Sequence, residues 1–422
     1  MRFQHLSAMR LPHLSVMRFF FVALLFSSSA FASPAQDLLN QAAYFIAVRY
    51  NGFSSADTSN FATQFQPELD LACKEMPENC PYSSAVPIIQ KMMTALNDGH
   101  SYYLSPEQYE EQLAQARGLG GSSLRLGIIT ADAKDSFERI VADVWAGSTA
   151  GKAGLKRGDR IVGFNNQSAS VLAENFRTLL AKEVSSGNEV RLNLRRAGLP
   201  LELKVRGSSL RSPLPSYKTI NAKVGYLRLP IFDVSGAVAS TVHSILKTQK
   251  NLAPNLIIDV RDNPGGLATE TIGAVGAFVE KSGFILETKD GSNEQRVEKG
   301  AVLIAGLRLN IVPQPFMYKG KVLVLVNKNS YSGAEYFAQL LQDQKRVTVI
   351  GETTGGLGNT ATIPFALQDN SAIFITVSRS LRLSGGYLPA AVTPDVLVPD
   401  DLELQSVTGK DAVLEKALEL LR

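Results

Sequence analysis

The sequence predicts a multidomain α+β protein with a helical N-terminal region, a β-rich middle part and an α/β core. The chain has 422 residues, which at roughly 100–200 residues per domain corresponds to two or three units. Apolar residues recur at helical spacing before residue 117, whereas short alternating runs dominate from 122 to 208. Beyond residue 216, apolar strand-like runs alternate with helical segments, a pattern typical of a largely parallel buried sheet.

The first 32 residues have the pattern of a secretory signal peptide. Three arginines precede the apolar run 19–26, and Ala30-Phe31-Ala32 forms an A-x-A cleavage signal before Ser33. The run is much shorter than the ~20 residues of a membrane span, so we expect no stable span; an uncleaved anchor is the alternative. Cleavage would leave 390 residues with a net charge of +1. We therefore expect an exported protein, periplasmic or else secreted.

Composition excludes several classes of protein. Hydrophobic residues make up 45% and charged residues 19%, which excludes a disordered, collagen-like or coiled-coil chain. The net charge of +4, without a basic stripe, argues against a nucleic-acid partner. Two cysteines cannot form a disulfide-rich scaffold or a four-cysteine zinc site, and we expect neither a metal nor a cofactor. In an oxidising compartment Cys73 and Cys80 are expected to form a local disulfide; a free thiol or a metal pair is the alternative.

The N-terminal region, residues 33–117, is expected to be helical. Residues 35–50 and 86–96 carry apolar residues at helical spacing. Ser105-Pro106-Glu107-Gln108 predicts a helix start, with Ser at the N-cap, Pro at the first position and Gln at the third. That helix is expected to end near residue 117, before a glycine-rich break.

The middle part, residues 118–210, is expected to be a β-rich domain. It contains strand-like runs at 124–129, 140–144, 189–195 and 201–205, with a helix expected at 171–181. It also contains the string Ala153–Asn165, A-G-L-K-R-G-D-R-I-V-G-F-N, which is the most specific part of a resemblance to a PDZ domain. The resemblance implies a peptide-binding groove, with Leu126, Gly127 and Ile128 at the carboxylate-binding loop. A β-rich domain that binds no ligand is the alternative.

The core is expected over residues 211–405, followed by a C-terminal helix within 406–422. Strands are expected at 224–229, 256–260, 322–326 and 347–350, with helices at 234–249 and after residue 332. Ser332 follows a buried strand and a tight loop and precedes a helix, so free N–H groups of the helix start could stabilise an oxyanion beside it. The alternative is a capping box with Glu335.

Two further segments carry candidate chemistry. The strand 256–260 continues into Asn263-Pro264-Gly265-Gly266, a turn whose glycines allow positive φ and leave N–H groups unshielded. His100 stands on a glycine-containing loop between two helical segments. The other histidine beyond the leader, His243, lies within a predicted helix, where a solvated or half-buried role is expected.

Together these strings resemble the S41 family of serine peptidases, the C-terminal processing and tricorn-core group. The match covers roughly residues 86–400 and includes, in order, Asp98-Gly99-His100-Ser101, the PDZ-like unit, 256–266, 326–335, Gly351-Glu352-Thr353-Thr354 and Val392-Thr393-Pro394-Asp395. The resemblance implies a ClpP/crotonase-like peptidase core. It also implies that Ser332 is the nucleophile and that Gly265, Gly266 and Gly333 form the oxyanion hole. Asp343 matches a family Asp that we interpret as structural.

One departure from the family concerns the general base. The processing branch uses a lysine 25 residues after the serine, and here that position is Leu357, which cannot accept a proton. The tricorn-like branch uses a histidine instead, and His100 stands at the matching string. A neutral imidazole suits a general base. Glu352 and Asp98 are the candidates for the acid that orients it.

The function implied is an exported serine endopeptidase acting on unfolded or C-terminally tagged proteins. The PDZ unit would select or gate a peptide substrate. The first alternative is a catalytically silent scaffold of the same fold that binds a peptide or ligand. The second is a hydrolase with the same chemistry on a non-peptide substrate.

Overall fold

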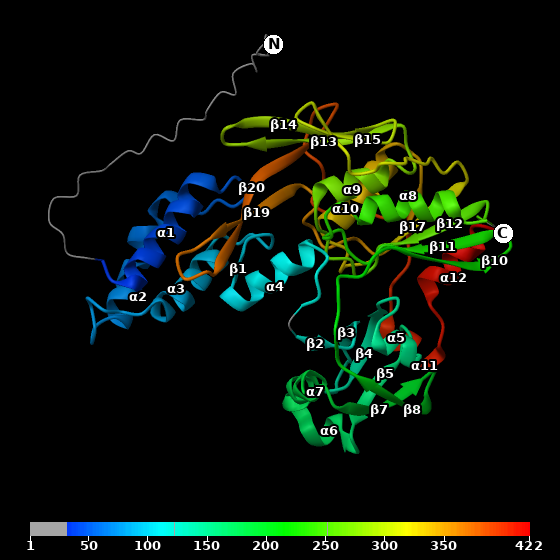
Figure 1. The fold of residues 1–422 in the computed structure, drawn as a ribbon, viewed down its shortest axis with the longest axis horizontal. Coiled ribbons are helices and arrows are strands. Elements are labelled where there is room, and N and C mark those ends of the chain that lie inside the picture. Colours follow the sequence, from blue (N-terminus) through cyan, green and yellow to red (C-terminus); the bar gives the residue numbers. More distant parts are fainter. Residues whose placement is uncertain (1–31, 122, 251) are drawn as a thin grey trace, which may run out of the picture.

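A computed structural model describes residues 32–121, 123–250 and 252–422 (Figure 1). The predicted leader, apart from Ala32, lies outside the described residues. Within the described part of the chain, no helix has the length and apolar character needed to cross a membrane. The mixed, multidomain α/β architecture confirms the predicted fold class.

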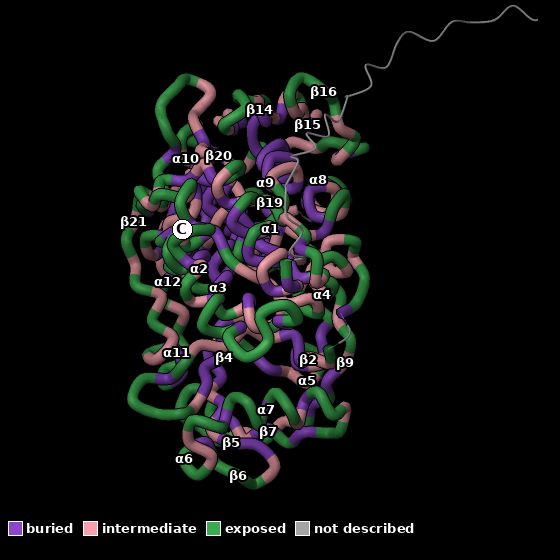
Figure 2. The backbone as a smooth tube through the Cα atoms, turned by 90° about the vertical axis from the view of Figure 1, so that its left-hand side faces the viewer, coloured by how far each residue is buried: buried purple, intermediate pink, exposed green. Residues whose placement is uncertain are grey.

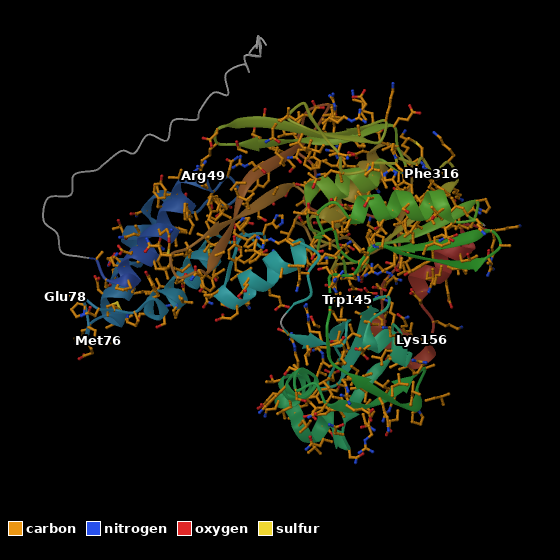
Figure 3. The ribbon with its side chains drawn as sticks, in the orientation of Figure 1. Arg49, Met76, Glu78, Trp145, Lys156 and Phe316 are labelled. Carbon is orange, nitrogen blue, oxygen red and sulfur yellow. A yellow bond between two sulfur atoms is a disulfide. The ribbon has the colours of Figure 1, made fainter. Side chains whose placement is uncertain are left out.

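The N-terminal region is helical. Its helices are α1 (Pro34–Arg49), η1 (Thr58–Asn60), α2 (Phe61–Ala72), α3 (Tyr82–Ala95) and α4 (Pro106–Ala116). The predicted capping box starts α4, because Ser105 Oγ accepts from Gln108 N–H and the Gln108 side chain accepts from Ser105 N–H. Cys73 and Cys80 form a disulfide that closes the loop after α2, where Met76 and Glu78 project in Figure 3.

A mainly antiparallel unit, here called the β-rich unit (residues 123–210), lies below the rest of the molecule in the view of Figure 1. Its main sheet has the order β3-β4-β5-β7-β8, so β3 is an edge strand. The elements are β2 (Leu124–Arg125), β3 (Ile128–Asp132), β4 (Arg139–Val144), α5 (Thr149–Ala153), β5 (Arg160–Phe164), β6 (Gln167–Ser168), α6 (Ala169–Leu172), η2 (Ala173–Asn175), α7 (Phe176–Ser185), β7 (Glu189–Arg196), β8 (Leu199–Arg206) and β9 (Ser208–Ser209).

Two helix predictions need correction. The helix expected at 171–181 is interrupted because Ala173 has φ 47°, a left-handed conformation that cannot continue an α-helix, and α7 begins only at Phe176. The helix expected from residue 234 is α8 (Val238–Thr248). The chain before it turns at Gly236, whose N–H donates to the buried carboxylate of Glu270.

The core sheet is mostly parallel and has the order β10-β11-β12-β17-β18-β21. Its strands are β10 (Ser216–Asn221), β11 (Val224–Arg228), β12 (Asn255–Asp259), β17 (Lys321–Val326), β18 (Thr348–Gly351) and β21 (Val396–Leu397), and its helices are α8, α9 (Ala268–Val275), α10 (Gly333–Asp343) and α12 (Ala412–Glu419). Alternate residues of each strand face opposite sides. Leu256 and Ile258 pack with α8, α9 and α10, whereas Ile257 packs against α12.

A second, antiparallel sheet was not predicted. It has the order β1-β20-β13-β14-β15-β16, with β19 also on β20. The strands are β1 (Tyr102–Leu104), β13 (Lys281–Thr288), β14 (Gly291–Glu298), β15 (Ala301–Ile304), β16 (Leu307–Leu309), β19 (Thr360–Ala366) and β20 (Ala372–Arg382). Because β1 pairs with β20, the N-terminal region is joined to the core, and Figure 2 shows the buried backbone concentrated around α9, α10 and β20.

The C-terminal segment contacts both the β-rich unit and the core. The unpredicted helix α11 (Leu402–Thr408), which spans the boundary expected at 405/406, lies on the β-rich unit: Ser406 O accepts from Gly198 N–H, and Glu403 pairs with Arg160. The following α12 buries Val413 and Ala417 against the core sheet. The last residues of the chain therefore connect the β-rich unit to the core, with α11 on the β-rich unit and α12 on the core sheet; both helices are red in Figure 1.

Candidate active site

Ser332 stands in a strained turn between β17 and α10. Its φ of 49° and ψ of −111° lie outside the regions that non-glycine residues favour, at a cost of about 1–3 kcal/mol. The preceding loop is anchored, since Ser330 Oγ donates to Val260 O at 2.8 Å and accepts from Asn327 N–H at 3.1 Å. A sharp, anchored strand-to-helix turn places Ser332 at the carboxyl end of a parallel strand, where α/β proteins bind their ligands.

The Gly265–Gly266 turn lies directly against Ser332. Both glycines have positive φ, 99° and 136°. A Cβ atom on Gly265 would lie 2.8 Å from Ser332 Cβ and 2.7 Å from Gly333 N, so a side chain would not fit there. Gly265 N–H donates to Asn263 Oδ1 at 2.8 Å, which leaves the amides of Gly266 and Gly333 as the better candidates for oxyanion donors.

Glu335 links the Ser332 turn to another loop. Its fully buried carboxylate accepts from Ser332 N–H at 2.8 Å, as the predicted capping box requires. It also accepts from Thr354 Oγ1 at 2.6 Å and from the N–H groups of Gly356 and Leu357 at 2.7 and 2.8 Å. Burial raises the pKa of the Glu335 carboxyl against these hydrogen bonds. The contacts beyond Ser332 could not be inferred from local spacing.

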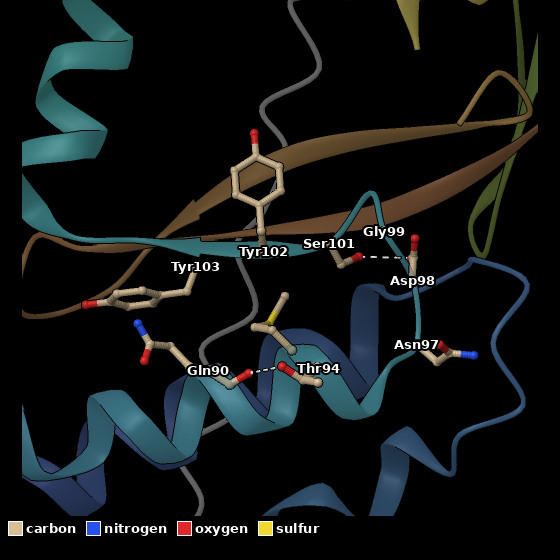
Figure 4. A pocket seen from close by; sticks show the side chains of 9 residues that line it. Gln90, Thr94, Asn97, Asp98, Gly99, Ser101, Tyr102 and Tyr103 are labelled. Atoms are coloured by element: carbon tan, nitrogen blue, oxygen red, sulfur yellow. Dashed lines mark hydrogen bonds between the residues drawn. The ribbon is translucent and has the colours of Figure 1, made fainter. Parts of the chain in front are cut away.

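His100 lies on the loop between α3 and β1 and is 8% exposed. The Asp98 carboxylate accepts from His100 N–H at 2.9 Å and from Ser101 Oγ at 3.0 Å, and Figure 4 shows the second bond beside a cavity of about 370 Å³. Asp98 therefore bonds to the His100 backbone, whereas the ring nitrogen Nδ1 lies 2.9 Å from Thr360 Oγ1. Burial lowers the pKa of His100 to about 4, with the nearby Asp98 charge acting in the opposite direction.

The segment 354–360 contacts both candidate catalytic loops. Leu357 N–H is bonded to Glu335, three residues after Ser332, and Thr360 Oγ1 is bonded to His100. The Leu357 side chain packs beside the His100 loop, since a Cβ on Gly99 would lie 3.6 Å from Leu357 Cδ2. A cavity of about 490 Å³ opens here, lined by residues that include Tyr50, Phe53, Asp98, Gly99, Leu357 and Thr360.

No hydrogen bond between described residues joins the side chains of the remaining acidic and histidine candidates to Ser332 or His100. Glu352 follows β18 and is half-buried, and no hydrogen bond or ion pair found among the described residues joins its carboxylate to His100. Asp343, at the end of α10, pairs with Arg382 at 2.9 Å near the surface. His243 is fully buried rather than solvated or half-buried: its Nε2 lies 3.0 Å from Gly273 O and its Nδ1 accepts from Phe316 N–H at 2.8 Å.

The predicted carboxylate-binding loop of the β-rich unit lies at the start of the edge strand β3. It consists of Leu126, Gly127 and Ile128. Leu126 O accepts from Ala150 N–H at 3.2 Å, and Gly127, with φ 76°, leaves no room for a side chain, since a Cβ there would lie 2.4 Å from Ser148 Cβ and 2.9 Å from Leu210 Cδ1. Ile128 begins β3, whose free edge could accept an added strand.

A buried charge network joins the β-rich unit to the core, and it was missed at the sequence level. Arg157 donates to Asp262 at 2.7 Å and to Asp400 at 2.5 Å. Asp262 directly precedes the Asn-Pro-Gly-Gly turn, and Asn327 Oδ1 accepts its N–H at 2.9 Å. Arg261 joins the same cluster, pairing with Asp400 at 2.9 Å. The only local signal was the clustering of Arg and Asp at the end of an apolar strand.

No group of three or more His, Cys, Asp or Glu residues suited to hold a metal ion occurs in the part of the chain that the structure describes.

Comparisons with known proteins show what this chain is similar to. Residues 223–398 match the model of Peptidase family S41. The chain is 29% identical over 308 residues to the carboxy-terminal processing protease CtpA of Bacillus subtilis, covering 71% of this chain and 60% of the relative. It is 25% identical over 315 residues to a probable CtpA-like serine protease of Staphylococcus aureus, covering 74% and 59%. The match thus spans about 60% of the length of these relatives.

Solved structures share the fold. The photosystem II D1 C-terminal processing protease aligns with a TM-score of 0.54 at 21% identity, over 90% of this chain and 99% of its own. A putative S41 protease from Bacteroides fragilis aligns with a TM-score of 0.57 at 18% identity, over 79% and 89%.

Proposed function

Because residues 223–398 match the model of Peptidase family S41, we propose that the protein is a serine endopeptidase with Ser332 as nucleophile and His100 as general base. One observation carries the proposal. The Ser332 turn, with the Gly265–Gly266 turn packed against it, and the His100 loop both bond to the same short segment, 354–360. A nucleophile, candidate oxyanion donors and an imidazole are the parts that acyl transfer requires.

In the proposed reaction, His100 Nε2 accepts the proton of Ser332 Oγ as the oxygen attacks the substrate carbonyl. The N–H groups of Gly266 and Gly333, with the N-terminus of α10, stabilise the negative oxygen of the tetrahedral intermediate. The imidazolium then protonates the leaving amine and the acyl-enzyme remains. Water, deprotonated by the same ring, releases the carboxylic acid and restores Ser332.

We propose that the substrates are peptides or unfolded chain ends. The relatives named carboxy-terminal processing proteases support this class. The PDZ-like β-rich unit would bind the substrate as an extra strand on the open edge of β3, next to Leu126–Ile128. The ion pair between Arg157 and Asp262 gives this unit a direct contact to the oxyanion turn, which supports gating.

Export is part of the proposal. Cleavage after Ala32 would leave Ser33 as the first residue, and Ser33 Oγ accepts from Gln36 N–H at 3.3 Å to cap α1. The first helix would therefore keep its cap in the mature protein. N-terminal sequencing of the protein recovered from the periplasmic and extracellular fractions should return Ser33; a chain that keeps residues 1–32 would contradict the cleavage.

The second candidate is a silent scaffold that binds peptides without turnover. The observation that favours it is Leu357, which stands where the processing branch has its lysine and packs beside the His100 loop. Such a protein would keep the groove of the β-rich unit but lack a competent base.

The test is cleavage of a denatured protein by the leader-free chain and its Ser332→Ala and His100→Ala variants, with fluorophosphonate labelling of Ser332. Ser244→Ala, at an exposed serine on α8, serves as the control. Loss of cleavage in both site variants and labelling that depends on Ser332 would support the proposal. Full activity of His100→Ala would exclude the imidazole as the base. A wild type without cleavage or labelling would favour the scaffold.

A further inference from the structure

The His100 ring is held by a residue that the family resemblance did not indicate. Nδ1 of His100 lies 2.9 Å from Thr360 Oγ1, and both side chains are buried, at 8% and 5% exposure. The acid nearest in sequence, Asp98, bonds to the backbone N–H of His100 instead. The hydroxyl of Thr360 therefore occupies the place at Nδ1 that an aspartate takes in a Ser-His-Asp triad.

Thr360 is itself held against the helix that follows Ser332. Its carbonyl accepts from the Tyr336 hydroxyl at 3.0 Å, and Tyr336 belongs to α10. The same hydroxyl is hydrogen-bonded to Ser380 Oγ on β20, the strand with which β19 pairs. Through its backbone Thr360 is tied to the nucleophile's helix, and through its side chain it contacts the His100 ring.

We propose that Thr360 is the positioning residue for His100, accepting a hydrogen bond from Nδ1–H and so leaving Nε2 unprotonated. This inference rests on the proposed function, because it concerns the same base. A neutral imidazole carries its proton on one nitrogen or the other, and a bond that engages Nδ1–H fixes both the tautomer and the orientation of the ring. Only the Nδ1–H tautomer allows Nε2 to accept the proton of Ser332.

The surroundings of His100 show why the tautomer matters and what Thr360 contributes. Burial of His100 lowers its pKa to about 4, so the ring is neutral at pH 7 and its tautomer decides which nitrogen acts as base. The charged group that acts on the ring is the Asp98 carboxylate, two residues away on the same loop. Thr360 contributes no charge, so its effect is on geometry and tautomer rather than on the stability of an imidazolium.

The test combines nitrogen NMR with kinetics on the leader-free chain labelled with ¹⁵N-histidine. Only His100 and His243 remain beyond residue 32. Because His243 Nδ1 accepts the Phe316 N–H, His243 must carry its proton on Nε2 and serves as an internal reference. We expect the Nδ1–H tautomer for His100 in the wild type and in Thr360→Ser. Thr360→Val, which keeps the shape but removes the hydroxyl, is expected to lose it.

In the same variants kcat should fall about 10–100-fold in Thr360→Val and recover in Thr360→Ser, because a ring misplaced by ~1 Å costs a factor of this order. Thr360→Ala provides a second hydroxyl-free variant, and Thr362→Val is the matched control on the same strand. An Nε2–H tautomer in the wild type, or an unchanged tautomer and kcat in Thr360→Val, would overturn the inference. The NMR result does not require turnover. A tautomer controlled by Thr360 in an inactive wild type would overturn the proposed function and still support Thr360 as the residue that orients the ring.

Discussion

The charge network between the β-rich unit and the core makes a specific prediction for Arg157. The Arg157 side chain is 17% exposed, and its partners Asp262 and Asp400 are 1% and 4% exposed. Arg157→Met would leave both carboxylates without this partner in a poorly solvated place. Removing one member of a buried ion pair typically costs about 3–5 kcal/mol, mostly because the remaining charge stays buried.

The remaining contacts place the expected cost at the lower end of that range. Asp262 keeps the Asn327 and Asn329 side-chain amides at 3.0 and 2.9 Å, and Asp400 keeps Arg261 at 2.9 Å. We therefore expect Arg157→Met to lower the free energy of unfolding by about 3 kcal/mol. Arg157→Lys should lose less, because one charged contact can form.

Urea unfolding followed by two signals measures this effect. Trp145, the single tryptophan of the chain, reports on the β-rich unit at its side facing the core (Figure 3), and far-UV circular dichroism reports on the helices elsewhere. In the wild type the two transitions should coincide, whereas in Arg157→Met the Trp145 transition should move to lower urea and separate from the other. kcat should also fall, because Asp262 bonds to the Asn327 loop that leads to Ser332.

The controls define what would refute this reasoning. Arg206→Met removes an exposed arginine from the same unit and should stay within about 0.5 kcal/mol of the wild type. Combining Arg157→Met with Asp262→Asn should give a coupling energy of about 1–3 kcal/mol. If Arg157→Met matched the Arg206→Met control, with coincident transitions, the network would not hold the two units together.

Three further predictions concern other parts of the molecule. Burial lowers the pKa of His100 from its ordinary 6.5 to about 4, so as the pH falls the unfolded chain takes up a proton before the folded chain does. The free energy of unfolding should therefore drop by about 3 kcal/mol between pH 6.5 and pH 4. The same acid titration of His100→Gln should not show this loss of stability. Replacing Cys73 and Cys80 by Ser should lower the free energy of unfolding by about 2 kcal/mol, as expected for a disulfide that closes a short loop, and thermal unfolding measures this. An unchanged melting temperature would show that the disulfide does not constrain the unfolded chain. Val413→Asp should detach α12, because it places a carboxylate against the core sheet. Limited proteolysis should then cut after residue 410. A variant as resistant to the protease as the wild type would contradict a role of α12 in holding the C-terminal segment on the core.

The local signals in the sequence predicted many of the elements and the strand-to-helix turn that carries Ser332. Ser105 and Gln108 form the predicted capping box because both partners lie within one helical turn. The apolar run 321–326 forms a buried parallel strand, and the Ser332 turn follows it. Each of these patterns depends on residues a few positions apart, and interactions at that range are determined by backbone geometry and side-chain type.

Tertiary structure alone decided which distant segments meet. The pairing of β1 with β20 joins residues 102–104 to 372–374, the His100–Thr360 contact spans 260 residues, and the Arg157–Asp262 pair spans 105. No local periodicity carries this information, since a threonine in an alternating strand or an arginine in a turn is compatible with many partners. The sequence by itself predicted an α/β core with a serine just after a buried strand, and a resemblance to family S41. The pairing of β1 and β19 with the same strand, β20, determined that Thr360 contacts His100, because only the folded chain brings this buried hydroxyl to the buried ring.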